Sequence, residues 1–241
     1  MTRINSKTLA DFIKKVSVNG SMPDGLLKFG PEGLTLTLKD ITKTGAVTGL
    51  LKKSNFVEYS EMTIPIKNMS ILLSILGTMN GMVDLSKQDN IFRITSETLD
   101  SEIIMPEEQY LQCALDQIPT LGHDGGFELD SSIFGTLKKT TQILGTTKVG
   151  IIAEVKNKVL YLRTGENNFD NLTAKASVDY KDVSAKYGMT FLEFISVMTG
   201  KVTVAFNADY PILITSTDPD STVKWMISPV IEKADENQDG V

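Results

Sequence analysis

Few residues of this 241-residue chain have the types and spacing that catalysis requires. The single histidine, His123, stands in Leu-Gly-His-Asp-Gly-Gly, which is typical of a turn in a flexible loop rather than of a general base. The single cysteine, Cys113, has no basic neighbour in sequence that would favour its thiolate, so we interpret it as a buried or loop thiol. Asp218-Pro219-Asp220 is typical of a hairpin turn rather than of a metal site.

Motifs of nucleotide-dependent and hydrolytic enzymes are also missing from the sequence. Neither the phosphate loop GxxxxGK[ST] nor the nucleophile elbow GxSxG occurs. One histidine and one cysteine cannot supply the ligands of a Cys/His metal site. We therefore expect a protein that is not an enzyme, with no catalytic residues, no cofactor and no bound metal.

Lysines, in contrast, recur in four segments whose apolar residues follow the spacing of a one-sided helix. These predicted helices span 6–17, 67–79, 131–145 and 189–200. Together they contain six lysines against one Asp and one Glu, although the whole chain has a net charge of −6. On one helix such lysines mark only a solvated face. Their recurrence on an acidic chain favours surfaces that attract the phosphates of duplex DNA without reading its sequence.

The elements that position these lysines occur twice along the chain. Ile94-Thr95-Ser96 followed by Asp100-Ser101 matches Ile214-Thr215-Ser216 followed by Asp220-Ser221, at a constant offset of 120 residues. Both halves also open with a helix that carries a Lys-Lys pair, at 14–15 and at 138–139. Each half reads helix, strands, helix, strands. The predicted fold class is therefore α+β, with two tandem, structurally similar domains, each with two helices packed on antiparallel sheets.

We place an N-terminal domain at 1–106, an interdomain connector at 107–124, a C-terminal domain at 125–232 and a disordered acidic tail at 233–241. A lone cysteine excludes an intramolecular disulfide and is typical of a reducing compartment. The sequence shows no signal-peptide pattern and no apolar run of the ~18–20 residues that a membrane span needs. We expect a protein of the cytoplasm or nucleus that is not secreted and has no membrane partner.

The C-terminal stretch resembles the closing pattern of the PCNA-type DNA sliding clamps. Asp209-Tyr210-Pro211-Ile212-Leu213-Ile214 is similar to the family's D-x-P-Φ-Φ-Φ strand, where Φ is apolar. Ile227-Ser228-Pro229-Val230-Ile231-Glu232 is similar to its Φ-A-P-x-I-E ending, with Ser228 in place of the usual Ala. The resemblance implies a divergent viral, phage or archaeal-like processivity factor whose three subunits close a ring around DNA, with helices lining the hole.

The resemblance also implies three sets of site residues. The lysines that face DNA would be Lys7, Lys14, Lys15, Lys67, Lys138, Lys139 and Lys201. A pocket between the connector and the C-terminal strand would take a helical turn from a partner, lined by Ile41, Ile118, Leu121, Pro211, Met226, Pro229 and Ile231. The subunits would join through edge strands at about 99–105 and 172–180, with interface residues Ile103, Met105, Leu172, Ala174, Ala176 and Val178.

The implied partners are double-stranded DNA, a DNA polymerase, a clamp-loader ATPase, other proteins with clamp-binding motifs, and two further copies of this chain in a homotrimer. Two alternatives stay open at the level of sequence. One is a monomeric polymerase accessory factor of the same fold, which would hold DNA on one basic face. The other is a duplicated-domain viral structural protein with no DNA role.

Overall fold

The computed structural model describes residues 1–123, 125–143, 150–188 without 165–171, and 190–231. Four α-helices lie in these ranges: α1 (Ser6–Val16), α2 (Met69–Thr78), α3 (Ser132–Ile143) and α4 (Thr190–Ile195). Two short 3₁₀ turns accompany them, η1 (Lys53–Asn55) and η2 (Glu108–Tyr110). None of these helices has the length and hydropathy that crossing a lipid bilayer requires.

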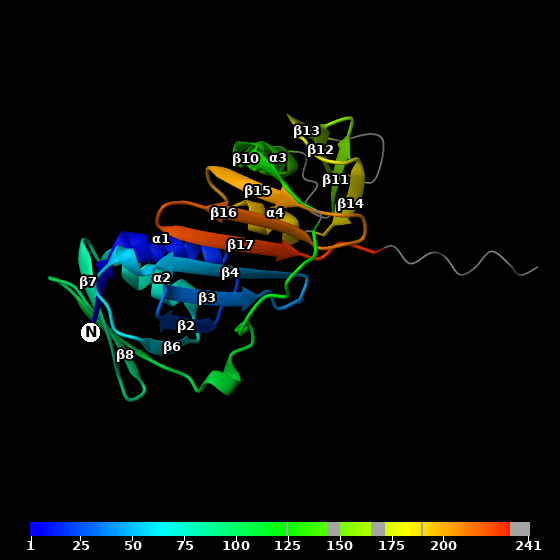
Figure 1. Cartoon of the computed structure of the whole chain (residues 1–241). Helices are drawn as coiled ribbons and strands as arrows, with labels where there is room; N and C mark the ends of the chain where they lie inside the picture. The colour runs from blue at the N-terminus through cyan, green and yellow to red at the C-terminus, as the bar shows by residue number, and fades with distance from the viewer. Residues whose placement is uncertain (124, 144–149, 165–171, 189, 232–241) are drawn as a thin grey trace, which may run out of the picture.

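The strands form three antiparallel sheets (Figure 1). The first sheet has the order β5 (Phe56–Glu58), β1 (Thr2–Asn5), β7 (Met82–Gln88), β8 (Ile91–Thr95) and β9 (Asp100–Ile104). The second has the order β13 (Leu172–Ser177), β12 (Val159–Thr164), β11 (Ile151–Lys156) and β14 (Val183–Tyr187). The third, eight-stranded sheet has the order β10 (Phe127–Asp130), β15 (Lys201–Ala205), β16 (Ile212–Thr217), β17 (Ser221–Ile227), β4 (Gly45–Lys52), β3 (Gly33–Lys39), β2 (Gly25–Gly30) and β6 (Met62–Ile66).

The duplication appears in the order of the strands. The series β1-β7-β8-β9 of the first half corresponds to β10-β15-β16-β17, and β4-β3-β2-β6 corresponds to β13-β12-β11-β14. The two halves meet where β17 pairs with β4 in an unbroken register from Ser221↔Leu51 to Ile227↔Gly45. The predicted α+β fold with two tandem, similar domains is confirmed. The boundaries assigned to the domains remain predictions, and the acidic tail lies outside the described residues.

One part of the predicted repeat is wrong, because the two corresponding hairpins differ in length. Ile94 pairs with Ser101 in the first, whereas Ile214 pairs with Trp225 in the second. Both hairpins close with the same turn hydrogen bond, from Ser96 N to Leu99 O and from Asp218 N to Ser221 O, each 2.9 Å. The second hairpin therefore contains two more residue pairs, and the 120-residue offset does not hold on its returning strand.

The helices are shorter than the sequence predicts, because local hydrogen bonds set where they begin and end. Asn68 rather than Lys67 caps α2, since its side chain accepts a hydrogen bond from Ile71 N at 3.1 Å. Helix α4 ends at Ile195, five residues before the predicted end. After it, Val197 N and Met198 N bond to the carbonyls three residues earlier, at 3.4 and 3.3 Å, so the chain tightens into turns before Gly200.

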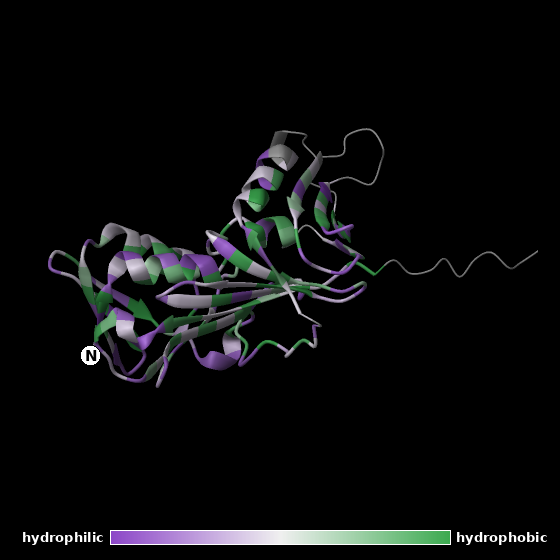
Figure 2. Ribbon diagram, turned by 45° about the horizontal axis from the view of Figure 1, so that its top comes forward, coloured by the Kyte–Doolittle hydropathy of each residue, from purple (hydrophilic) through white to green (hydrophobic). Residues whose placement is uncertain are grey.

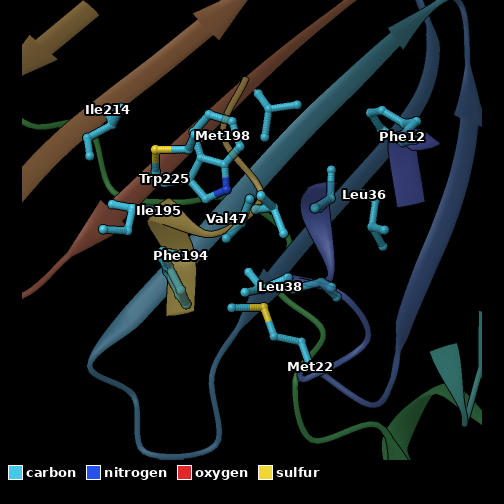
Figure 3. Close-up of a cluster of buried hydrophobic side chains, with 14 of the residues drawn as sticks. Phe12, Met22, Leu36, Leu38, Val47, Phe194, Ile195, Met198, Ile214 and Trp225 are labelled. Atoms are coloured by element: carbon cyan, nitrogen blue, oxygen red, sulfur yellow. The ribbon is translucent and has the colours of Figure 1, made fainter. Parts of the chain in front are cut away.

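The core continues across the junction between the two halves. Trp225 on β17 is fully buried beside its ladder partner Val47 on β4. Figure 3 shows Phe194 and Met198 around this pair, so side chains from both halves share one apolar cluster. Helix α1 packs on β3, β4 and β17 of the shared sheet, and α4 also packs on β17. Separation of the halves would expose this cluster to water, which makes the junction a structural unit rather than a linker.

Gly49 on β4 lies under α1 and leaves no room for a side chain. A Cβ at this position would lie 2.4 Å from Val16 Cγ2 and 2.9 Å from Phe12 Cε2. We expect Gly49→Ala to lower the free energy of unfolding by about 1–3 kcal/mol, since overpacking a dense core forces neighbours off their rotamers. The measurement is the urea midpoint. Gly30→Ala is the control, because a Cβ there meets nothing within 4 Å; equal shifts would contradict the packing argument.

Candidate DNA-facing and partner-facing surfaces

Helices α1 and α2 lie side by side and expose a polar surface. Asn5 caps α1 by accepting hydrogen bonds from Lys7 N at 3.0 Å and Thr8 N at 3.2 Å. The apolar face of α1 is buried as predicted, which turns Lys7 and Lys14 to solvent. A hollow of about 660 Å³ separates the two helices, and its lining includes both lysines and Ser74 of α2. Lys7 and Lys14 therefore point away from the shared sheet.

The polar surface of α1 continues onto the segment that follows α4. A second hollow, of about 430 Å³, is lined by Lys14 and Lys15 from α1 and by Ser196 and Thr199 from that segment. Asn19 Nδ2 donates a hydrogen bond to Ser196 Oγ across it, at 3.4 Å. Helical surfaces of the two halves thus adjoin on one side of the molecule, as Figure 2 shows for the helices above the shared sheet.

The C-terminal half adds further lysines to its own helical layer. Lys139 on α3 is exposed, and Lys138 is half-buried. Lys201 is exposed at the start of β15, where it pairs in the ladder with Asp130. The Asp130 carboxylate accepts a hydrogen bond from Ser132 N at 2.8 Å, and this bonding to Ser132 lowers its pKa, with a smaller contribution from Lys201. Phe134 and Leu137 of α3 are buried, whereas Ile133 is only half-buried.

Lys15 has a second role, because it holds the turn of the longer hairpin. Its Nζ lies 3.3 Å from Asp218 Oδ2. On the other side of that turn, Lys52 N donates to Asp220 O at 3.0 Å, Lys52 Nζ donates to Pro219 O at 2.8 Å, and Asn55 Nδ2 donates to Asp220 O at 3.0 Å. The second hairpin is longer by two residue pairs, so its turn at 218–220 reaches the first half. We call the contacts of Lys15, Lys52 and Asn55 with this turn the hairpin clasp.

Lys67 is placed differently from the other lysines. It lies just before α2, and its Nζ donates to Tyr110 O at 3.1 Å and stands 3.8 Å from Asp24 Oδ2. Tyr110 belongs to the predicted connector. The structure therefore sets Lys67 against the connector, whereas Lys7 and Lys14 line the hollow between α1 and α2.

The predicted connector is bound along the shared sheet. Ala114 forms a β-bridge with Leu38, and Cys113 O accepts from Lys39 N at 2.8 Å. Figure 2 shows this segment below the sheet, opposite to the helices. Burial, and then the negative charge of Asp24, raise the pKa of the Cys113 thiol. Cys113 is fully buried and stays protonated at neutral pH, which fits a packed thiol rather than a nucleophile.

The loop that carries Ile41 and the C-terminal segment that carries Pro229 and Ile231 meet at one end of the shared sheet. Ser228 N donates to Thr44 O at 2.8 Å, which joins the loop that carries Ile41 to the C-terminal segment. The ring of His123, at the end of the connector, lies 5.3 Å from that of Tyr210, next to Pro211. Ile41 and Ile231 are exposed, and the remaining predicted pocket residues are half-buried: Ile118, Leu121, Pro211, Met226 and Pro229.

Two exposed apolar residues, one on the C-terminal segment and one on the connector, were missed from the sequence. Val230 is 41 % exposed and Tyr110 is 60 % exposed. Val230 lines a hollow of about 570 Å³ together with Ile231, Lys186 and Asp209. Val230 lies within the closing motif, so it could have been included, whereas nothing in the sequence pattern separates Tyr110 from an ordinary loop residue.

Both predicted edge strands lie at the edges of their sheets, β9 in the first and β13 in the second. Their side chains point differently from what the sequence suggested. Met105, Ala174 and Val178 are buried within their own half, and Ile103 and Ala176 pack against the same core; the side chain of Leu172 lies outside the described residues. The exposed apolar residue of β9 is Ile104, at 76 %. An Ala176 substitution would therefore act on the fold of the C-terminal half itself.

No metal site accompanies these surfaces within the described ranges, since no group of three or more His, Cys, Asp or Glu side chains there could hold an ion. The duplicated α+β arrangement, with helices on one side of a shared sheet and a connector on the other, is the fold of the ring clamps of the PCNA type. No protein-family model and no curated protein matches the sequence.

Solved structures identify the fold more closely. The chain is similar to PCNA in a structure described as the C-terminal region of FEN-1 bound to A. fulgidus PCNA, with a TM-score of 0.79 and 15 % identity, covering 97 % of this chain and 100 % of the other. PCNA from Entamoeba histolytica gives 0.78 and 17 %, with 95 % and 99 % covered. A PCNA2–PCNA3 complex from Sulfolobus tokodaii gives 0.75 and 15 %, with 95 % and 98 % covered. The chain thus has the PCNA fold over nearly its full length.

The hairpin clasp should make stability depend on pH. Burial acts to raise the pKa of Asp218, but hydrogen bonds from Ser221 and the ion pair with Lys15 outweigh it, so the pKa lies below its ordinary value of 3.8. A lowered folded pKa stabilises the protein above about pH 4, and this contribution is lost as the pH falls through the folded pKa. We expect Asp218→Asn to lower the thermal midpoint at pH 7 and to match the unaltered protein more closely at pH 3. A difference that is independent of pH would exclude the ionised carboxylate as its cause.

Proposed function

We propose that this chain is a DNA sliding clamp, a ring-forming, non-enzymatic processivity factor that encircles duplex DNA without sequence specificity. The observation that carries the proposal is that the strand pairing inside the chain could also form between copies of the chain. Within the chain β17 pairs with β4, and the counterparts of these strands in the other half, β9 and β13, are the edge strands.

A second copy can repeat the internal junction by pairing its β13 with β9 of the first. Such a contact is head-to-tail, so an open assembly of any number of copies has one free β9 and one free β13 until the ring closes. Exposed edge strands favour pairing with another chain, and Ile104 adds an exposed apolar residue at the β9 edge. PCNA-type clamps, which this chain resembles, form rings of three subunits, so we propose three copies here.

Within such a ring, the helical layer would face the hole. Lys7, Lys14, Lys15, Lys138, Lys139 and Lys201 lie on or beside this layer. Their positive charge would attract phosphates, while the small polar side chains between them, such as Ser74, bind no base. An acidic chain with a basic helical layer would hold DNA inside the ring and repel it elsewhere.

The partner surface would be the end of the shared sheet where the connector meets the C-terminal segment. Ile41, Val230 and Ile231 are exposed apolar residues there, which suits a helical turn with apolar anchors. The similar A. fulgidus protein has the C-terminal region of FEN-1 bound to it. For this chain we propose a DNA polymerase, a clamp-loader ATPase and other DNA enzymes as partners, in the cytoplasm or nucleus.

Charge reversal on the helical layer tests the DNA path. We expect Lys7→Glu, Lys14→Glu and Lys139→Glu together to weaken binding of duplex DNA and to reduce the slope of log K against log[salt] by up to about 0.9 per lost phosphate contact. Fluorescence anisotropy at several salt concentrations measures both. The control reverses Lys87, Lys156 and Lys224, which are equally exposed but lie on strands. If the control weakens binding as much as the helical triple, the helices are not the DNA surface.

An exposed charge at the β9 edge tests ring closure. We expect Ile104→Glu to convert the oligomer to monomers, because pairing with β13 would desolvate an unpaired carboxylate. Val57→Glu is a matched control, since Val57 is 72 % exposed on β5, the opposite edge of the same sheet. Light scattering gives the mass of each variant. An oligomer that survives Ile104→Glu would remove β9 from the contact.

A further inference from the structure

We infer that Asp24 and Lys67 form a latch that fixes the course of the connector on the shared sheet and thereby positions the partner surface. The role of the partner surface rests on the proposed function. The contacts of the latch do not depend on that function. It assigns Lys67 to partner binding rather than to the DNA path.

Asp24 is the buried half of the latch. Its side chain is only 3 % exposed, although a carboxylate in the core is costly without partners. It accepts two hydrogen bonds from the connector backbone, from Gln112 N at 2.9 Å and Cys113 N at 2.8 Å, both through Oδ1. Bonds to an ionised acceptor are among the strongest that a protein makes. A carboxylate 88 residues earlier in the chain thus holds the middle of the connector.

Lys67 is the exposed half of the latch. Its Nζ donates to Tyr110 O at 3.1 Å and lies 3.8 Å from Asp24 Oδ2, the carboxylate oxygen that the two amides do not use. The ammonium group therefore binds the connector at Tyr110, just before the two amides at 112 and 113, and offsets part of the charge of Asp24. These two side chains, from the loop before β2 and the segment before α2, together hold residues 110–113.

The latch lies where the connector becomes part of the sheet. Immediately after the held amides, Leu38 bridges to Ala114 and Leu115 N donates to Thr37 O at 3.1 Å. Lys28 Nζ then pairs with Asp116 Oδ1 at 2.8 Å. The next residues, Ile118 and Leu121, belong to the predicted partner pocket. A shift at residues 112–113 would therefore be passed directly to the pocket wall.

Two variants and a matched control test the latch on the full-length protein. Asp24→Asn keeps the size and one acceptor oxygen but removes the charge. Lys67→Met keeps the aliphatic stem and removes the ammonium group. Lys87→Met is the control, because Lys87 lies on β7 of the first sheet and its Nζ also donates to a backbone carbonyl, Thr63 O at 2.9 Å, rather than to a carbonyl of the connector.

The first readout is hydrogen exchange of the Gln112 and Cys113 amides, which needs no partner. We expect exchange on the order of tenfold faster in Asp24→Asn, since loss of a charge-assisted bond favours local opening, and a smaller increase in Lys67→Met. The second readout is affinity for a peptide of the FEN-1 C-terminal region, which we expect to weaken by roughly tenfold. Duplex DNA binding should not change in Lys67→Met. The control should change none of the three.

The outcomes separate the latch from the proposed function. Unchanged amide exchange in both variants would overturn the latch, whatever the partner does. Faster exchange with unchanged peptide affinity would overturn its role in positioning the pocket. If the variants exchange faster but the unaltered protein binds no peptide, the result supports the latch and counts against the proposed partner surface. Weaker DNA binding by Lys67→Met would return Lys67 to the DNA path.

Discussion

The pairing of β17 with β4 is the constraint on which the other features depend. This ladder of seven residue pairs turns two four-stranded half-sheets into one sheet and buries Trp225 between the halves. Because the sheet is continuous, α1 and the segment after α4 lie side by side on one face, and the connector crosses the other. A polar helical surface facing one way and the proposed partner surface facing the other therefore follow from one strand pairing. This pairing uses β17 of the second half and β4 of the first. Their counterparts, β9 of the first half and β13 of the second, remain at free sheet edges.

Much of the fold could be predicted from the sequence, since the repeat and the helical periodicity are local signals. The spacing of Leu9, Phe12, Ile13 and Val16 fixes the buried face of α1, and hence the exposed position of Lys14. The edge strands, in contrast, were located through the resemblance to the clamp family rather than through a local signal. Which of their side chains point outward could not be predicted, because Ile103, Ile104 and Met105 are all apolar and only the packed core decides the phase of the alternation.

The features that the sequence did not indicate are those whose environment is set by distant segments. Lys67 looks like another helical lysine until the connector, more than forty residues later, brings Tyr110 O and its neighbours against it. Asp24 gave no signal, because a single carboxylate in a Pro-Asp-Gly sequence is typical of a turn. The length difference between the two corresponding hairpins was hidden by the Asp-Ser match, because Asp100-Ser101 is paired in the first ladder, whereas Asp220-Ser221 lies at the turn of the second hairpin.

The hairpin clasp has a mechanical consequence. Lys15, Lys52 and Asn55 hold the turn at 218–220, which reaches them because its hairpin is two residue pairs longer than the corresponding one. The shorter turn at 96–99 makes no such contacts within the described residues. In the proposed ring, the strand pairing inside each copy would therefore be reinforced in a way that the pairing between copies would not. Mechanical load would then open the ring between copies and leave each copy folded.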